Sequence, residues 1–341
     1  MTTLSRRGFL KAGGMWSAAG LFRTGLRPVP RALPAGVPLG RVTELEARLF
    51  SRPTADSSLV GSLAFDEVIE AYRQVVGRGV QPHNHVWVET PRGYIWSSEL
   101  QPVRYQPNPL LESIPETGTW TEVTVPFVDG LLRPEPGAPV RYRLYYAMVL
   151  NIDGRVDGDD GVVYYRVHDE NNIVMYAPGE AFRQIQPAEV DPIHPDAEDK
   201  YIVVNLTRQD LSAMEAGVEV YYARVSSGYA VYEDGLRHWN TPIGQQWTWR
   251  KMVSRHMSGG DWVSGYDLPG VGWTILFSGT GAAIHSTYWH NDFGTPRSRG
   301  CINVRPEAGQ WLFRWSLPVV EYRPGDVTIQ GTIGTRVIVQ E

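Results

Sequence analysis

Short runs of alternating apolar and polar residues, separated by turn-forming residues, extend over most of the chain. The segment HNHVWVETPRGYIWSSELQPV, residues 83–103, places aromatic strands on either side of a Pro-Arg-Gly turn and predicts a β-hairpin. The segment VVYYRVHDENNIVMYAP, residues 162–178, has the same arrangement around a polar turn. Between them, QPNPLLESIPETG is typical of a linker. The pattern predicts two related small β modules, at residues 41–104 and 105–190, the second including the linker.

From residue 191 the pattern changes to longer strands with glycine-rich turns. We predict strands at Tyr201–Leu206 and Val218–Val225 around a short polar turn region, at Trp273–Phe277 and Ala282–His285, and in the closing segment 327–341. The segment RPEAGQWLFRWS predicts the single helix, with Pro306 in its first turn. Residues 191–341 are therefore expected to form one mostly β domain.

The N-terminal segment differs from the rest of the chain, because all of its charged side chains are basic. Arg6 and Arg7 precede Phe9, Leu10, Lys11 and an apolar stretch at 12–22, which resembles a twin-arginine export signal. That stretch is too short for a stable membrane span. We expect residues 1–35 to be this signal, the protein to be exported to the cell envelope, and no stable membrane anchor to remain after cleavage.

Composition then limits the partners. The chain has 341 residues, 42% of them hydrophobic, so it can bury a full core. Beyond residue 35 it carries 26 basic and 37 acidic side chains. This acidic balance argues against nucleic acid and against anionic lipid as partners.

Cys301 is the only cysteine of the chain, which excludes an internal disulfide. It is either an inert buried thiol or a nucleophile, and a nucleophile needs a base, a group that orients the base, and donors for an oxyanion. His285 precedes it by 16 residues, and the connection contains glycine and proline that allow it to fold back. The amides of Gly300 and Cys301 would face the oxyanion, and Ser286 would hold the imidazole.

The segment HSTYWHNDFGTPRSRGCINV, residues 285–304, resembles the signature of the L,D-transpeptidase catalytic domain, the YkuD-like family. The likeness continues through VVNLTRQDL, VSSG, NTPIG, HMSGGD and GTRVIV, and so covers roughly residues 198–341. Many family members have histidine before the Gly-Cys pair, where this chain has Arg299. That difference leaves open any contribution of a second histidine.

The resemblance implies a fold and a set of roles. The fold is a mainly β, L,D-transpeptidase-type β-sandwich with one helix near the active site, preceded by small β-barrel modules that resemble bacterial SH3-like domains. Cys301 would be the nucleophile, His285 its base, and the backbone carbonyl of Ser286 would orient the ring. The oxyanion pocket would be shaped by Ser298, Arg299 and Gly300, and the donor stem would be bound by Tyr288, Trp289, His290, Asn291, Asn303, Met257 and Gly259.

Family members act on peptidoglycan stem peptides. The thiolate attacks the carbonyl of the third residue, D-alanine leaves, and an amine of a neighbouring stem resolves the thioester to give a cross-link. A carbapenem would then acylate Cys301, and neither a cofactor nor a metal is expected.

Other functions stay open at this point. With water as acceptor, the same site would be a carboxypeptidase, and a protein with a decayed site would only bind the cell wall. A papain-like peptidase is disfavoured because there the cysteine precedes the histidine. His285, His290 and Asp292 have poor spacing for zinc, and the acidic run at 153–161 has no glutamate at the twelfth position of a calcium loop.

Overall fold

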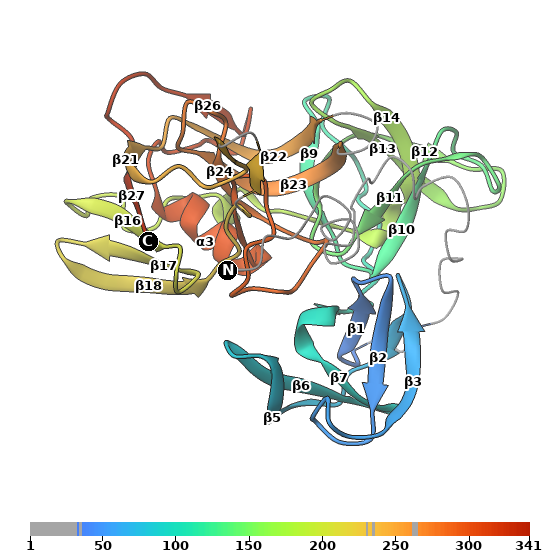
Figure 1. Cartoon of the computed structure of the whole chain (residues 1–341). Helices are drawn as coiled ribbons and strands as arrows, with labels where there is room; N and C mark the ends of the chain where they lie inside the picture. The colour runs from blue at the N-terminus through green and yellow to red at the C-terminus, as the bar shows by residue number, and fades with distance from the viewer. Residues whose placement is uncertain (1–32, 34–35, 230, 234–235, 261–264) are drawn as a thin grey trace.

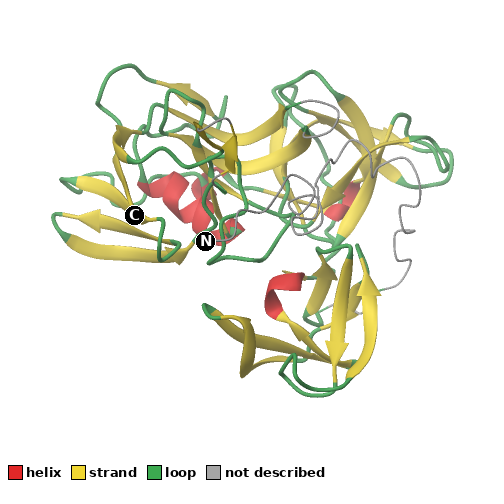
Figure 2. Cartoon of the chain, in the orientation of Figure 1, coloured by secondary structure: helices red, strands yellow, loops and turns green. Residues whose placement is uncertain are grey.

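The computed structural model describes residues 33, 36–229, 231–233, 236–260 and 265–341. Apart from Leu33, the export signal predicted at residues 1–35 lies outside the described residues. Strands dominate the described part, which contains one α-helix (Figure 2). Over the described residues, the prediction of a mainly β protein with one helix is confirmed.

The N-terminal region, residues 39–103, contains two antiparallel sheets, with strand orders β4-β1-β8 and β3-β2-β7-β6-β5 (Figure 1). Its elements are β1 (Leu39–Val42), β2 (Glu46–Phe50), β3 (Leu59–Ala64), β4 (Val68–Glu70), β5 (Arg73–Gln81), β6 (Asn84–Thr90), β7 (Gly93–Trp96), the 3-10 turn η1 (Ser97–Glu99) and β8 (Leu100–Val103).

The middle region, residues 119–184, is one seven-stranded antiparallel sheet of order β11-β10-β14-β13-β12-β9-β15. Its strands are β9 (Thr119–Val123), β10 (Phe127–Leu131), β11 (Val140–Tyr145), β12 (Val149–Asp157), β13 (Val163–His168), β14 (Val174–Pro178) and β15 (Phe182–Gln184), with the 3-10 turns η2 (Gly179–Ala181) and η3 (Pro187–Glu189) near its end.

The C-terminal region, residues 200–340, has two five-stranded sheets, β18-β17-β16-β27-β21 and β25-β24-β23-β22-β26, and a small hairpin β19-β20. Its elements are β16 (Lys200–Asn205), β17 (Asp210–Glu215), β18 (Val218–Arg224), β19 (Val231–Glu233), β20 (Leu236–His238), β21 (Gly244–Trp247), β22 (Arg250–Gly259), β23 (Tyr266–Leu276), β24 (Ala283–Ser286), β25 (Ile302–Val304), α3 (Pro306–Trp315), β26 (Asp326–Thr328) and β27 (Arg336–Gln340).

Helix α3 joins the two five-stranded sheets of the C-terminal region into one core. Ala308, Leu312 and Trp315 recur at helical spacing and are buried, and they share a hydrophobic cluster with strands of both sheets. Pro306 occupies the first turn, where its missing N–H costs nothing. The buried ammonium of Lys251 on β22 donates to the carbonyls of Phe313 and Ser316, which lie at the C-terminal end of the helix.

Most of the elements predicted from alternation are present. The hairpin predicted at 83–103 is β6-β7, and the one predicted at 162–178 is β13-β14. The polar turn region expected between residues 206 and 218 is wrong, because it contains strand β17. Leu211 and Ala213 are buried on one face of that strand, and Asp210, Ser212 and Met214 occupy the other, so only two buried apolar positions mark the core face.

A buried ionic cluster connects the three regions. Asp66 of the N-terminal region accepts from Arg41 at 2.7 Å, from Arg143 of the middle region at 3.2 Å, and from the Tyr145 hydroxyl at 3.1 Å. The same Arg41 donates to the carbonyl of Tyr288 in the C-terminal region, at 2.5 Å. Both Asp66 and the two arginine side chains are about 1% exposed. Arg41 also donates to Gln101 and Arg143 to Asp129, so the cluster combines bonds within each region with bonds between the regions.

No helix among the described residues is both long and apolar enough to cross a bilayer.

We predict that Asp66→Asn lowers the free energy of unfolding by about 3–5 kcal/mol, because it leaves two buried guanidinium groups without their shared carboxylate. Asn keeps the volume of the side chain and accepts the positive φ of 63° at this position. Urea denaturation followed by tryptophan fluorescence measures the change.

The matched control is Asp56→Asn, which removes the carboxylate of the exposed Arg78–Asp56 pair. Exposed pairs contribute between 0 and about 1 kcal/mol, so its unfolding curve should nearly overlay that of the parent. Equal losses in the two variants would contradict a special role for the cluster.

Candidate active site

Strands β24 and β25 bring His285 and Cys301 to one face of a sheet. The two strands pair in parallel, with Ile284 opposite Ile302 and His285 opposite Asn303. Both isoleucines point into the core shared with α3. Since side chains alternate along strands, His285 and the residue just before β25, Cys301, point to the opposite face. The Cys301 side chain accordingly packs with Met252, Leu276 and Ala283 outside the α3 core.

The imidazole of His285 is held in one orientation. The ring is buried, and its Nδ1 lies 2.9 Å from the carbonyl oxygen of Ser286. A carbonyl only accepts, so Nδ1 carries the proton and Nε2 of the neutral ring has a free lone pair. The Ser286 hydroxyl itself donates to the carbonyl of Gly272 at 2.8 Å. Burial lowers the pKa of His285 to about 4, so the ring is neutral near pH 7.

The thiol of Cys301 is also neutral at rest. Cys301 is partly exposed and lines a pocket. Desolvation by the surrounding protein raises the pKa of the thiol above its ordinary value. A backbone hydrogen bond from Ala283 and the charge of Arg255 lower it to a smaller extent. Thiol and imidazole are therefore both uncharged before substrate arrives, and proton transfer from sulfur to Nε2 would create the nucleophile.

The turn before Cys301 is fixed by Ser298. Its hydroxyl donates to the carbonyl of Cys301 at 2.5 Å and accepts the Gly300 N–H at 3.1 Å. Gly300 has a φ of 117°, a conformation that favours glycine. The Gly300 amide is thus already used within the turn, which leaves the Cys301 amide as our candidate for an oxyanion donor.

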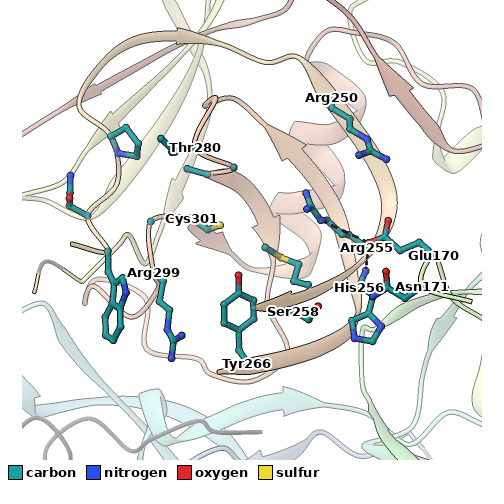
Figure 3. A pocket seen from close by; sticks show the side chains of 17 residues that line it. Glu170, Asn171, Arg250, Arg255, His256, Ser258, Tyr266, Thr280, Arg299 and Cys301 are labelled. Carbon is teal, nitrogen blue, oxygen red and sulfur yellow. Dashed lines mark hydrogen bonds and ion pairs between the residues drawn. The ribbon is translucent and has the colours of Figure 1, made fainter. Parts of the chain in front are cut away.

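The pocket in front of Cys301 has a volume of about 830 Å3 (Figure 3). Its walls come from β22, from the start of β23, from the turn between β23 and β24, from the Cys301 turn, and from two loops at 170–171 and 239–242. The lining residues are Glu170, Asn171, Trp239, Asn240, Pro242, Arg250, Arg255, His256, Met257, Ser258, Tyr266, Thr280, Gly281, Ala282, Arg299, Gly300 and Cys301.

Arg299 forms part of the rim. Its guanidinium lies 4.7 Å from the ring centroid of Trp239 and 5.3 Å from that of Tyr266, both within the range of cation–π attraction. In the position where many relatives have histidine, this chain therefore has an arginine held between aromatic rings.

The predicted substrate-binding residues divide into two groups. Met257 lines the pocket, and Gly259 lies two residues further along β22. The others lie on the long connection between β24 and β25 or on β25 itself, and they are not among the pocket-lining residues: Tyr288, Trp289, His290, Asn291 and Asn303.

These other residues contact the rest of the protein. The Tyr288 hydroxyl donates to the carbonyl of Pro269 at 2.8 Å. His290 Nε2 lies 2.9 Å from the Asn303 amide nitrogen, and burial lowers the pKa of His290 to about 3. The Asn291 side chain donates to the carbonyl of Ser97 in the N-terminal region at 2.9 Å. Trp289 is half-buried, with its ring centroid 5.7 Å from that of His285.

The middle region contributes a wall of the pocket that sequence reasoning missed. Glu170 and Asn171 lie in the β13-β14 turn, which is attached to β22 through His256. The ring of His256 lies between Asp169 and Asp267, at 2.5 Å from each, and these carboxylates raise its pKa to about 9 against the opposing effect of burial. This imidazolium is a buried ionic link between the middle region and the C-terminal region. The one sequence signal was the unusually polar His-Asp-Glu-Asn-Asn turn.

Within the described residues, no group of three histidine, cysteine, aspartate or glutamate side chains is arranged to hold a metal ion.

Comparison with known proteins gives one match to a family model. Residues 199–339 match the model of the YkuD family, the L,D-transpeptidase catalytic domain. Among curated proteins no relative matches.

Several solved structures are similar to part of the chain. A mutant of the Enterococcus faecium L,D-transpeptidase is 25% identical, with 43% of this chain and 51% of that chain covered and a TM-score of 0.32. The catalytic domain of the E. faecium enzyme is 26% identical, with 42% and 97% covered and a TM-score of 0.31. Mycobacterium tuberculosis L,D-transpeptidase 3, in complex with a faropenem-derived adduct, is 17% identical, with 57% and 91% covered and a TM-score of 0.32.

This chain spans about half the length of the E. faecium L,D-transpeptidase mutant that it matches. The match to the family model covers the β16–β27 region, which contains both His285 and Cys301. Residues 199–339 of this chain are therefore similar to the YkuD family of L,D-transpeptidase catalytic domains.

Proposed function

We propose that this protein is an exported L,D-transpeptidase that cross-links peptidoglycan stem peptides through a thioester on Cys301. The observation that carries the proposal is the Cys301 thiol at the pocket wall, on the same sheet face as the His285 imidazole. The Nδ1–H of that ring donates to the Ser286 carbonyl, which leaves Nε2 unprotonated. The match of residues 199–339 to the model of the YkuD family supports this proposal.

Acylation begins with the neutral pair. The thiol of Cys301 transfers its proton to Nε2 of His285, and the sulfur attacks the carbonyl carbon of the third stem residue. The Cys301 amide donates to the oxyanion. When the carbon–nitrogen bond breaks, the imidazolium returns the proton to the leaving amine, and D-alanine departs with the thioester left on the enzyme.

Transfer of the acyl group follows these steps in reverse, with an amine of a neighbouring stem in place of D-alanine. The side-chain amine of a neighbouring stem attacks the thioester carbon and loses a proton to His285 as the amide forms. The thiolate leaves and recovers that proton. The product joins the third residues of two stems, and water in place of the amine would give a free tripeptide instead.

We also propose that residues 1–35 direct export by the twin-arginine pathway and that the two β regions before residue 190 are SH3-like modules. The proposed substrate is consistent with export of the protein, since peptidoglycan lies outside the inner membrane.

We predict that the purified protein converts a disaccharide tetrapeptide into a cross-linked dimer, and that Cys301→Ala abolishes the product. Removal of the nucleophile removes the only covalent route, so the loss should exceed 1000-fold, about 4 kcal/mol in activation free energy. Mass spectrometry of the products measures both outcomes. The control is His194→Gln. His194 is exposed and is not among the pocket-lining residues, so this variant should keep full activity.

The same experiment separates the other functions. Release of D-alanine and tripeptide without a dimer would support a carboxypeptidase. Binding of the stem peptide without any product would support a wall-binding protein, and would contradict the proposal.

We predict that carbapenem acylation of Cys301 is nearly independent of pH between 5.5 and 7.5. With a pKa of about 4, His285 stays unprotonated throughout this range, and transfer of a proton from thiol to imidazole leaves the total number of protons unchanged. The rate should fall only as the pH approaches 4, where protonation removes the base. Intact-mass measurement of the adduct over time gives the rate. An inflection near pH 6.5 would show instead an imidazole with ordinary acidity.

A further inference from the structure

Arg255 extends from β22 into the wall of the pocket, and part of its guanidinium group makes no hydrogen bond. Its side chain is 29% exposed. Among the described residues, the buried Nη1 has no hydrogen-bond partner. Its nearest acid is Glu170, with 3.9 Å between Nε and the carboxylate oxygen, which is beyond hydrogen-bond distance. That same oxygen already accepts the backbone N–H of His256 at 2.8 Å.

The other cationic side chains that line the pocket have their own partners. Arg250 makes two hydrogen bonds to the carboxylate of Asp326, at 3.0 and 2.6 Å. Arg299 lies over two aromatic rings. His256 is enclosed by two carboxylates. Arg255 therefore differs from them in lacking a hydrogen-bonded anion, and a guanidinium in this situation favours a carboxylate ligand.

Arg255 is also close enough to the reacting groups to act on them. In the view of Figure 3 its guanidinium lies between Cys301 and Glu170, facing the pocket. Its charge lowers the pKa of both the Cys301 thiol and the His285 imidazole. An anion bound to Arg255 would consequently lie near the carbonyl under attack.

The donor proposed above has a carboxylate close to the carbonyl under attack. D-alanine is the residue after the attacked carbonyl, and its carboxylate is one residue further along the chain, roughly 4 Å away. In a pentapeptide the terminal carboxylate moves a further residue away, and in an amidated stem it is absent.

We propose that Arg255 binds the terminal carboxylate of the departing D-alanine and thereby selects tetrapeptide donors. The inference rests on the proposed transpeptidase function and adds the residue that recognises the donor end. Arg255 makes and breaks no covalent bond: the carboxylate is released together with the D-alanine amine.

The test compares two donors, the disaccharide tetrapeptide and the same compound ending in D-alaninamide. The parent protein should prefer the free carboxylate by about 30- to 100-fold in kcat/KM. Arg255→Met should remove that preference by slowing the tetrapeptide alone, with a change below about threefold for the amide. Arg255→Lys, which keeps the charge but loses the planar fork, should have an intermediate preference.

Arg250→Met is the matched control. It removes a guanidinium from the same strand and the same pocket, but one already bonded to Asp326. It should keep the preference for the free carboxylate, whatever its effect on the overall rate.

Binding to Cys301→Ala protein, measured by calorimetry with both compounds, separates recognition from turnover. The proposal would be overturned if the parent protein did not distinguish the two donors. It would also be overturned if Arg255→Met lowered kcat/KM equally for both donors. If the parent turns over neither compound but still binds the tetrapeptide more tightly through Arg255, then the transpeptidase function fails and the carboxylate site stands.

Discussion

The site depends on the parallel pairing of β24 with β25. A parallel pair needs a connection that leaves one end of the sheet and returns to the other, and this is usually made by a helix. Here residues 287–301 make it without a helix, so the chain needs other contacts to hold the loop in place. The register of this pair puts His285 opposite Asn303 and so determines that the imidazole and the thiol share a face.

Those other contacts come partly from the C-terminal region, where the carbonyl of Ser227 accepts the backbone N–H groups of Arg297 and Ser298, and partly from the N-terminal region. Asn291 donates to the carbonyl of Ser97, the Thr295 hydroxyl lies 3.1 Å from His83, and Arg41 donates to the carbonyl of Tyr288. The middle region contacts the opposite wall through the His256 imidazolium between Asp169 and Asp267. The two β regions thus support the loop before the nucleophile and supply part of the pocket, which is more than a spacer would do.

The sequence predicted the local parts of this arrangement well. Both aromatic hairpins, the helix at 306–315 and the strand that delivers His285 followed from alternation and turn residues within about twenty positions. Strand β17 was missed because only Leu211 and Ala213 carried its pattern. Arg255 and Glu170 were missed for another reason: they are 85 positions apart, and only the docking of the middle region on β22 brings them together.

The connection between β24 and β25 shows the same limit. The resemblance to the family predicted that Tyr288, His290 and Asn291 accompany the catalytic pair, but it does not determine which way each side chain points. Tyr288 and His290 find partners within the C-terminal region, at Pro269 and Asn303, whereas Asn291 finds its partner at Ser97 of the N-terminal region. A buried polar side chain needs such partners, and the sequence does not reveal them when they lie nearly 200 positions away.

The electrostatics of the pocket separate reactivity from recognition. The positive charge of Arg255 stabilises a thiolate on Cys301 and destabilises an imidazolium on His285. When the proton moves from sulfur to Nε2, these two effects oppose each other, because one product of the transfer is stabilised and the other is destabilised. A donor carboxylate that neutralises Arg255 would therefore change the transfer equilibrium little. For this reason Arg255 governs which donor binds more than how readily the thiol loses its proton.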